Sequence, residues 1–124
     1  MQIANRKIGP NEKPLVIAEI GINHGGDVEV AKHMVQLAAK SGCECVKHQT
    51  HFVEDEMTEA AKQIFPPNAD MSIWDVMATC ALSKDDEIDL KNHTEDLGLI
   101  YLSTPFSRSA SDFLEEIGVP GFKI

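Results

Sequence analysis

The sequence predicts an α/β protein with a parallel sheet, and three observations support that fold class. Short apolar runs alternate with longer amphipathic segments along the 124 residues. Most amphipathic segments begin after a serine or an aspartate and end at a glycine, as helices commonly do. Each apolar run turns polar toward its carboxyl end. Alternating strands and helices favour right-handed crossovers, which make the strands parallel.

The elements follow in the order of the chain. The segment 2–13 is expected to form a small hairpin that turns at Gly9-Pro10-Asn11. Pro14–Gly21 is nearly all apolar, as in a strand buried on both faces. Asp27 is expected to cap a helix over 28–40, which Gly42 ends. Its apolar stripe is expected to be Val30, Met34, Leu37 and Ala38.

The middle of the chain holds the second strand and a long polar connection. The second strand is expected over Cys45–Thr50. The connection, His51–Met71, is broken by Pro66-Pro67 and contains one short helical stretch, "EDEMTEAAKQIF". Its Glu54–Glu56 start is expected to be solvated. Ser72 is expected to cap one further turn or two, with Ile73, Trp74, Met77 and Cys80 facing inward.

The last third predicts two more helices and two more strands. Ser83 starts a helix that Gly98 ends, and Ser83-x-x-Asp86 resembles a capping box. Its apolar side is expected to hold Ile88, Leu90, His93 and Leu97. The third strand is "LIYLSTPF", Ser107 or Ser109 caps a helix over 110–117, and "GFKI" opens a fourth strand.

Four strands of this kind make half of a (β/α)₈ barrel, whose usual length is about 250 residues. We therefore expect residues 1–124 to be a partial TIM-barrel catalytic domain, the N-terminal half of the barrel, truncated within strand four. A small open α/β sheet is the alternative on topology alone.

Composition limits the function classes. The formal net charge of −9 argues against a nucleic-acid surface, which needs clustered lysines and arginines. The sequence has no run of 18 apolar residues and no apolar core of a signal peptide near its start. The odd count of cysteines (Cys43, Cys45 and Cys80) predicts free thiols. We expect a cytoplasmic protein without a membrane partner.

Chemistry-bearing side chains gather where the strands end. Functional groups of parallel α/β folds cluster at the carboxyl ends of the strands. Period-two alternation puts Lys47, Gln49 and His51 on one face of the second strand, and Val46, His48 and Thr50 on the other. In a barrel, the first set meets Glu19 and Lys123, the polar groups of strands one and four.

Two lysines and a carboxylate that converge favour a site for a small phosphorylated or carboxylated anion. Ser103, Thr104 and the backbone N–H groups after Ser107 are expected to contribute to it. The alternatives without a binding function are a Lys47 that only forms a structural salt bridge and histidines that only make polar contacts. A metal site built from His24, His48 and His51 lacks a supporting ligand frame.

Four blocks resemble the N-acetylneuraminate (sialic acid) synthase family: "IAEIGINHGG", "VKHQTHFVEDEM", "YLSTPFSRSA" and "FKI". They occur in that family's order from about Pro14 to Ile124. The resemblance implies a TIM barrel followed by an antifreeze-like domain, which is expected to lie beyond Ile124 and so to be absent from this chain, in a domain-swapped homodimer. It also implies a divalent metal, Mn²⁺ or Mg²⁺, whose ligands are expected beyond residue 124.

The resemblance implies condensation of phosphoenolpyruvate with N-acetylmannosamine, in which C3 of phosphoenolpyruvate attacks the metal-polarised aldehyde. Glu19 resembles the catalytic glutamate that holds the metal-bound water. Lys47 and Lys123 resemble the lysines that clamp phosphoenolpyruvate. The remaining residues that resemble the phosphoenolpyruvate site are Gln49, Ser103, Thr104 and Phe106.

Three hypotheses stay open from the sequence. The first is a sialic acid synthase of which this chain is an inactive fragment. The second is a truncated, non-catalytic anion-binding or assembly module. The third is a sister synthase for legionaminic or pseudaminic acid.

Overall fold

The computed structural model describes residues 1–124 and has a three-stranded parallel sheet at its centre. The strands are β3 (Ile17–Gly21), β4 (Cys45–Thr50) and β5 (Ile100–Pro105), and β4 lies in the middle. Beyond β5, Phe122 forms an isolated parallel bridge with Ser103. The expected fourth strand is therefore present as a single bridge beside β5.

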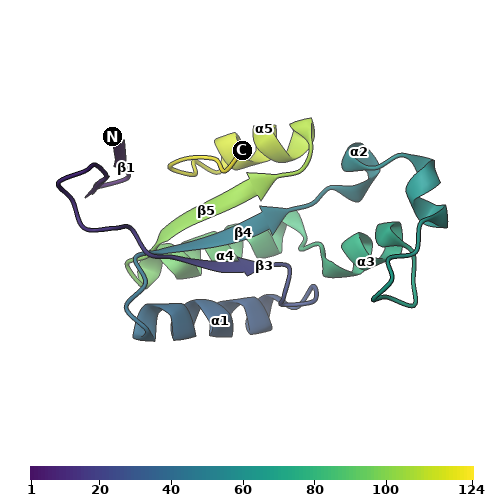
Figure 1. The fold of residues 1–124 in the computed structure, drawn as a ribbon, viewed down its shortest axis with the longest axis horizontal. Coiled ribbons are helices and arrows are strands. Elements are labelled where there is room, and N and C mark those ends of the chain that lie inside the picture. The colour runs from purple at the N-terminus through teal and green to yellow at the C-terminus, as the bar shows by residue number, and fades with distance from the viewer.

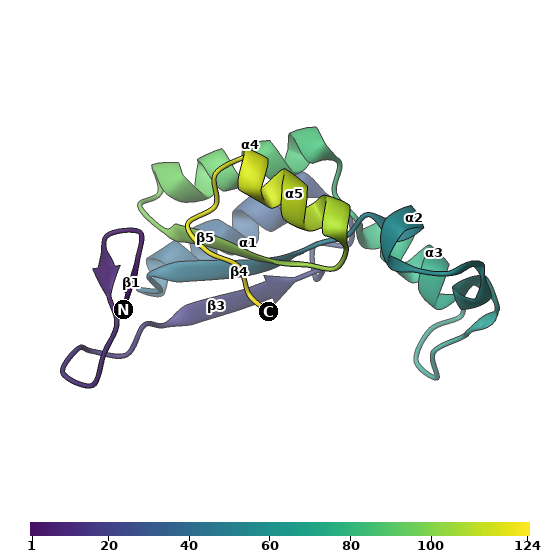
Figure 2. The same ribbon diagram turned by 90° about the horizontal axis from the view of Figure 1, so that it is seen from above.

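Three helices cover one face of the sheet (Figures 1 and 2). They are α1 (Val28–Lys40), α4 (Lys84–Asp96) and α5 (Arg108–Glu116). Helix α1 packs on β3 and on α4, whereas α4 and α5 pack on β5. The core between these layers includes Ile20, Val35, Val46, Leu90, Tyr101 and Leu114. No helix covers the opposite face of the sheet in Figure 2, and no helix of the chain is long and apolar enough to cross a bilayer.

The connection after β4 lies beyond the carboxyl ends of the strands (Figure 1). It contains α2 (Val53–Glu56), a 3₁₀ helix η1 (Glu59–Gln63) and α3 (Ile73–Cys80). The loop after β3 meets the end of α3 at Gly26, whose φ is +85°. A side chain at Gly26 would collide with the carbonyl oxygen of Thr79. Glycine is required there because the two backbones touch.

The hairpin exists, but its predicted turn was wrong. Strand β1 (Gln2–Ile3) pairs antiparallel with β2 (Arg6–Lys7), so the chain turns at Ala4-Asn5. Ala4 adopts a positive φ of 46°, which a tight two-residue hairpin turn demands. The side chain of Arg6 donates to Glu44 over 2.7 Å and ties the hairpin to the amino-terminal end of the sheet.

The predicted helix starts are confirmed, whereas two predicted apolar faces are wrong in part. The caps Asp27, Ser72, Ser83 and Ser107 each accept a bond from a backbone N–H in the first turn. Val30 and Leu37 of α1, and Ile88 and Leu97 of α4, are exposed. The side chains buried instead are Ala31, Val35 and Ala38 in α1, and Glu87, Leu90, Lys91 and Thr94 in α4.

Candidate functional site at the carboxyl ends of the strands

Glu19 and Lys47 form an ion pair across neighbouring strands. They are register partners in β3 and β4, and the Lys47 ammonium contacts the Glu19 carboxylate. The Lys47 side chain is 17% exposed and that of Glu19 is 48% exposed. This pair lies on the face of the sheet that no helix covers. A cation that is mostly shielded, beside a carboxylate that is half in solvent, leaves an anion one open side from which to approach.

Gly21 makes room for this pair. The register between β3 and β4 shifts between Glu19 and Gly21, and Gly21 has a φ of +57°. A Cβ at Gly21 would lie 3.4 Å from Glu19 Oε1 and 3.6 Å from Gln49 Nε2. The irregular end of β3 therefore brings a carboxylate and an amide to one small region.

Gln49 and His51 continue the polar row along β4, as the alternation predicts. His51 Nε2 lies 3.0 Å from Gln49 Oε1, and His51 Nδ1 lies 2.9 Å from the Glu56 carboxylate. The His51 ring stacks on Phe106 with 4.3 Å between ring centroids. The expectation that all of Glu54–Glu56 is solvated was wrong, because the Glu56 side chain is only 4% exposed. One turn of α2 directs Glu56 back toward the end of β4.

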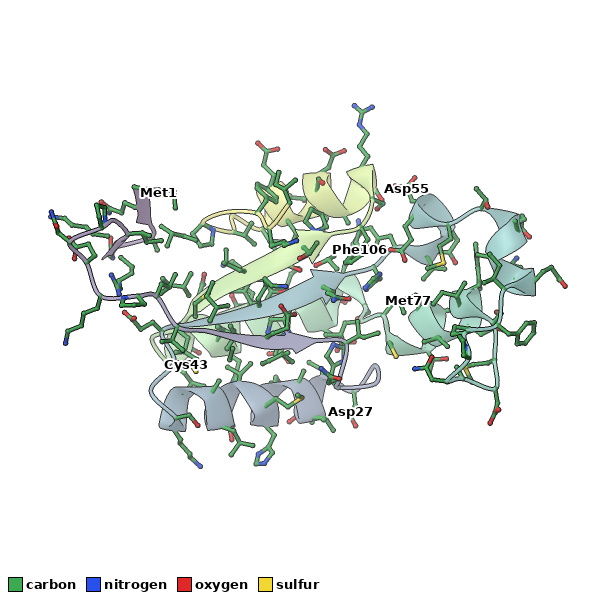
Figure 3. All side chains as sticks on the ribbon, in the orientation of Figure 1. Met1, Asp27, Cys43, Asp55, Met77 and Phe106 are labelled. Carbon is green, nitrogen blue, oxygen red and sulfur yellow. The ribbon has the colours of Figure 1, made fainter.

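The expected site residues Thr104, Phe106 and Lys123 lie in or beyond β5 and differ in their exposure to solvent. Thr104 is the register partner of Gln49, and Phe106 is half exposed at the end of β5. Figure 3 labels Phe106 and Asp55 near the carboxyl end of the sheet and Cys43 at the opposite end. Lys123 donates its backbone N–H to the carbonyl oxygen of Ser103, and its side chain is exposed without an ion pair.

The Ser103 side chain lies on the helix-covered face, away from Lys47. It is fully buried, and its Oγ is 2.7 Å from Thr50 Oγ1. Beside it, Tyr101 donates to Glu87 of α4 over 2.6 Å. Burial raises the pKa of Glu87 to about 7, against the smaller lowering effect of the hydrogen bond from Tyr101. The same burial raises the pKa of Tyr101 well above its usual value.

Two further histidines are buried. His48 stacks on Tyr101, neither ring nitrogen has a hydrogen-bond partner, and burial lowers its pKa to about 3. His24 accepts from the Gly26 N–H over 3.1 Å, and burial lowers its pKa as well. Both rings are therefore neutral at pH 7 and contribute no positive charge to the site.

The amino terminus of α5 is occupied from within the chain. The backbone N–H and the hydroxyl of Ser109 donate to Asp55 at 3.1 Å and 2.6 Å. Both bonds lower the pKa of Asp55, and the bond from the Ser109 hydroxyl has the larger effect. The Ser107 hydroxyl oxygen accepts a hydrogen bond from the backbone N–H of Ala110. The backbone N–H groups expected to bind the substrate anion after Ser107 thus hold a carboxylate of α2.

The residues of this chain do not by themselves fit a divalent metal. No group of three or more His, Cys, Asp or Glu side chains is placed to hold one. The three cysteines are unpaired, as expected. A hollow of about 500 Å³ lies at the amino-terminal end, lined by Arg6, Glu44 and Tyr101 among others. None of the predicted site residues lines it.

Comparison with known proteins decides the family. The model of the NeuB family matches residues 34–124, which is well over half of the chain and includes β4, β5 and the connection between them. The chain belongs to the NeuB family.

Relatives and a solved structure support the assignment to NeuB. N,N′-diacetyllegionaminic acid synthase of Campylobacter jejuni is 33% identical over 117 residues, which cover 91% of this chain and 35% of that protein. N-acetylneuraminate-9-phosphate synthase of Homo sapiens is 30% identical over 124 residues, covering 96% of this chain and 34% of that protein. This NeuB chain thus spans about a third of the length of the curated relatives it matches.

The crystal structure of N-acetylneuraminic acid synthetase from Leptospira borgpetersenii, in complex with citrate, matches with a TM-score of 0.82. The match is at 29% identity and covers all of this chain and 40% of that one. It confirms the predicted fold class, an α/β arrangement of the first strands and helices of a TIM barrel after a short hairpin. The resemblance to the sialic acid synthase family is confirmed with it.

Two buried carboxylates were not among the predicted site residues of this NeuB chain. Glu56 shares its sequence context with Glu54 and Asp55, and only the turn of α2 separates their environments. Glu87 occurs in an acidic helix start, where carboxylates are common on the solvent side. The spacing Glu87-x-x-Leu90 was the available signal, because residues three apart share a helix face.

Proposed function

We propose that the protein is an N-acetylneuraminate synthase, which condenses phosphoenolpyruvate with N-acetylmannosamine to give sialic acid and phosphate. One observation carries the proposal: the Glu19–Lys47 ion pair beside Gln49, at the strand ends of a NeuB-family chain. The two relatives named above, from Campylobacter jejuni and Homo sapiens, are both synthases of sugar acids. The activity belongs to the full-length protein.

Lys47 supplies the charge that a phosphorylated, carboxylated substrate requires. Its ammonium is already desolvated and paired, so an arriving anion takes over part of an existing ion pair. Gln49 adds an amide donor, and Thr104 and Phe106 flank it from β5. We assign Lys123 as the second cation, and the Ser103 carbonyl as the group that holds its backbone.

The reaction needs one proton acceptor near the substrate, and Glu19 is suited to that role. C3 of phosphoenolpyruvate forms a bond to the aldehyde carbon of the sugar, which leaves an alkoxide on the former aldehyde oxygen. Water adds at C2, and one of its protons passes through Glu19 to that alkoxide, which becomes a hydroxyl. The tetrahedral intermediate then expels phosphate by cleavage of the C–O bond, and the remaining proton of the C2 hydroxyl leaves with the phosphate as the keto group forms. A carboxylate that is half exposed can exchange protons with both water and substrate.

A divalent metal, Mn²⁺ or Mg²⁺, a homodimer and a cytoplasmic location belong to the same proposal. The residues of this chain alone do not form a set of ligands for that metal.

Product analysis tests the proposal. The full-length protein is incubated with N-acetylmannosamine and phosphoenolpyruvate that carries ¹⁸O in its C–O–P bridge. We expect sialic acid and ¹⁸O-labelled phosphate, and loss of both in Glu19→Ala and Lys47→Ala. The control is Lys40→Ala, an exposed lysine at the end of α1. Binding of phosphoenolpyruvate without any product would instead support a non-catalytic module.

A sister synthase is the second candidate, because the Campylobacter legionaminic acid synthase is slightly more similar than the human enzyme, at 33% against 30% identity. A panel of N-acetylated aldehyde sugars separates the two. Faster turnover of a diacetylated, deoxygenated sugar than of N-acetylmannosamine would favour a legionaminic or pseudaminic acid synthase.

A further inference from the structure

His51 links a buried carboxylate to the predicted anion site. The side chains of His51 and Glu56 are 2% and 4% exposed. Nδ1 of the ring lies 3.0 and 2.9 Å from the two carboxylate oxygens of Glu56. Nε2 lies 3.0 Å from Oε1 of Gln49, and the ring stacks on Phe106 at an interplanar angle of 22°. The ring is therefore fixed on both edges and on one face.

The partners define the protons on this ring. An amide oxygen only accepts hydrogen bonds, so Nε2 carries a proton and donates to Gln49 Oε1. Nδ1 faces the Glu56 carboxyl group, and the hydrogen bond between them needs one proton, on the ring or on the carboxyl group. In both arrangements Nε2 is the donor to Gln49.

Other charged groups near the ring fit this reading. Lys47 is paired with Glu19, and Asp55 of α2 is engaged with Ser109 of α5. His24, from the loop after β3, is neutral: burial is the main cause of its lowered pKa, and charge on His51 adds a smaller lowering. Glu56 is thus the carboxylate that faces His51.

The Nε2–H group of His51 sets the direction of the Gln49 amide. With its oxygen held by His51, the amino group of Gln49 points to the other side, 3.6 Å from the position of a Gly21 Cβ and close to Glu19. There it is a donor at the strand ends. A neutral ring with a free lone pair on Nε2 would turn the amide and present its oxygen, which repels an anion.

We propose that His51, held by Glu56, is a positioning residue that keeps the amino group of Gln49 directed toward the substrate anion. The inference rests on the proposed function in one respect, since the anion is the phosphoenolpyruvate of that reaction. His51 itself does not touch the substrate.

Kinetics of Glu56→Gln in the full-length protein test the proposal. The substitution keeps the size of the side chain and replaces the carboxyl group that faces Nδ1 of His51 by an amide. We expect the KM for phosphoenolpyruvate to rise roughly 10- to 100-fold, as for loss of a hydrogen bond to a charged group, with a much smaller change in kcat. His51→Phe, which keeps the stacked ring, should behave likewise. The matched control is Glu54→Gln on the exposed side of the same short helix. A wild-type KM in Glu56→Gln would overturn the proposal.

Nitrogen NMR of ¹⁵N-histidine-labelled protein gives a readout that does not depend on activity. We expect Nε2 of His51 to carry a proton in the folded protein, as its contact with Gln49 Oε1 requires, with the signals assigned by their loss in His51→Phe. An unprotonated Nε2 would refute the positioning role. If Nε2 is protonated but no product forms, the synthase proposal fails alone. If product forms and Glu56→Gln keeps its KM, the positioning role fails alone.

Discussion

His48 and His51 belong to the same short stretch of chain, yet their surroundings are opposite. Both rings are buried, and both stack on an aromatic ring. Neither nitrogen of His48 has a partner, and its pKa falls to about 3 because of burial. Both nitrogens of His51 have partners, one of them a carboxylate. The first ring is a neutral group stacked on Tyr101, and the second is the ring that we propose to position Gln49.

The two faces of β4 explain this difference. On the helix-covered face, Thr50 pairs with Ser103 and Tyr101 with Glu87, while His48 has no partner. The uncovered face carries the Glu19–Lys47 pair and Gln49. The proposed site therefore rests on the paired charges of the open face and not on burial alone.

Loss of Lys47 should have the largest effect on this comparison. Lys47→Met removes the cation and leaves Glu19 unpaired, so kcat/KM for phosphoenolpyruvate should fall by about 10²- to 10³-fold. Lys40→Met is the matched control and should keep wild-type kinetics. Comparable losses in both variants would show that the effect is not specific to the open face. The measurement is initial-rate kinetics of the full-length protein.

The same substitution at the two histidines compares them directly. His51→Phe should lower kcat/KM for phosphoenolpyruvate by roughly 10-fold or more, because a donor to Gln49 is lost. His48→Phe should leave the kinetics near wild type. The free energy of unfolding of the His48→Phe variant should change by no more than about 2 kcal/mol. The gain from removing two buried, unpaired nitrogens offsets the cost of fitting a larger ring. Equal losses of kcat/KM in the two variants would contradict the different roles of the two rings.

The buried Glu87 should make stability fall as pH rises. Its folded-state pKa of about 7 exceeds the ordinary glutamate value of 4.5, so the folded state holds the proton more tightly. That contribution is fully present below about pH 4.5 and is lost as the pH rises through about 7, a change of about 3 kcal/mol. Glu87→Gln should remove this part of the pH dependence of thermal unfolding, while Glu95→Gln, on the exposed side of α4, should retain it. An identical pH profile in Glu87→Gln would contradict the assigned burial.

Gly21→Ala should have the smallest effect. The left-handed φ of +57° costs a residue with a Cβ about 1 kcal/mol, and the added methyl contacts Glu19 and Gln49. We expect this modest loss of stability with a few-fold rise in the KM for phosphoenolpyruvate. Gly42→Ala, with a φ of +82° and open space around it, controls for backbone strain alone. A KM that rises equally in both would contradict a role of Gly21 in shaping the site.

The sequence was sufficient for the order of the main helices and strands and for the side-chain alternation along β4. Caps such as Asp27 and Ser83, and the alternation along β4, depend on local chemistry and were predicted correctly. Which face of α1 or α4 is buried depends on the neighbouring layer, and the periodicity selected Val30 and Leu37, which are exposed. Glu56 differs from Glu54 only in three-dimensional placement, so no pattern in the chain could select it.

The most direct measurement is a crystal structure of the full-length protein with phosphoenolpyruvate bound. The account predicts an anionic group of the substrate within hydrogen-bonding distance of both Lys47 Nζ and Gln49 Nε2, with Gln49 Oε1 still accepting from His51. Phosphoenolpyruvate bound elsewhere, with the Glu19–Lys47 pair undisturbed and uncontacted, would contradict it.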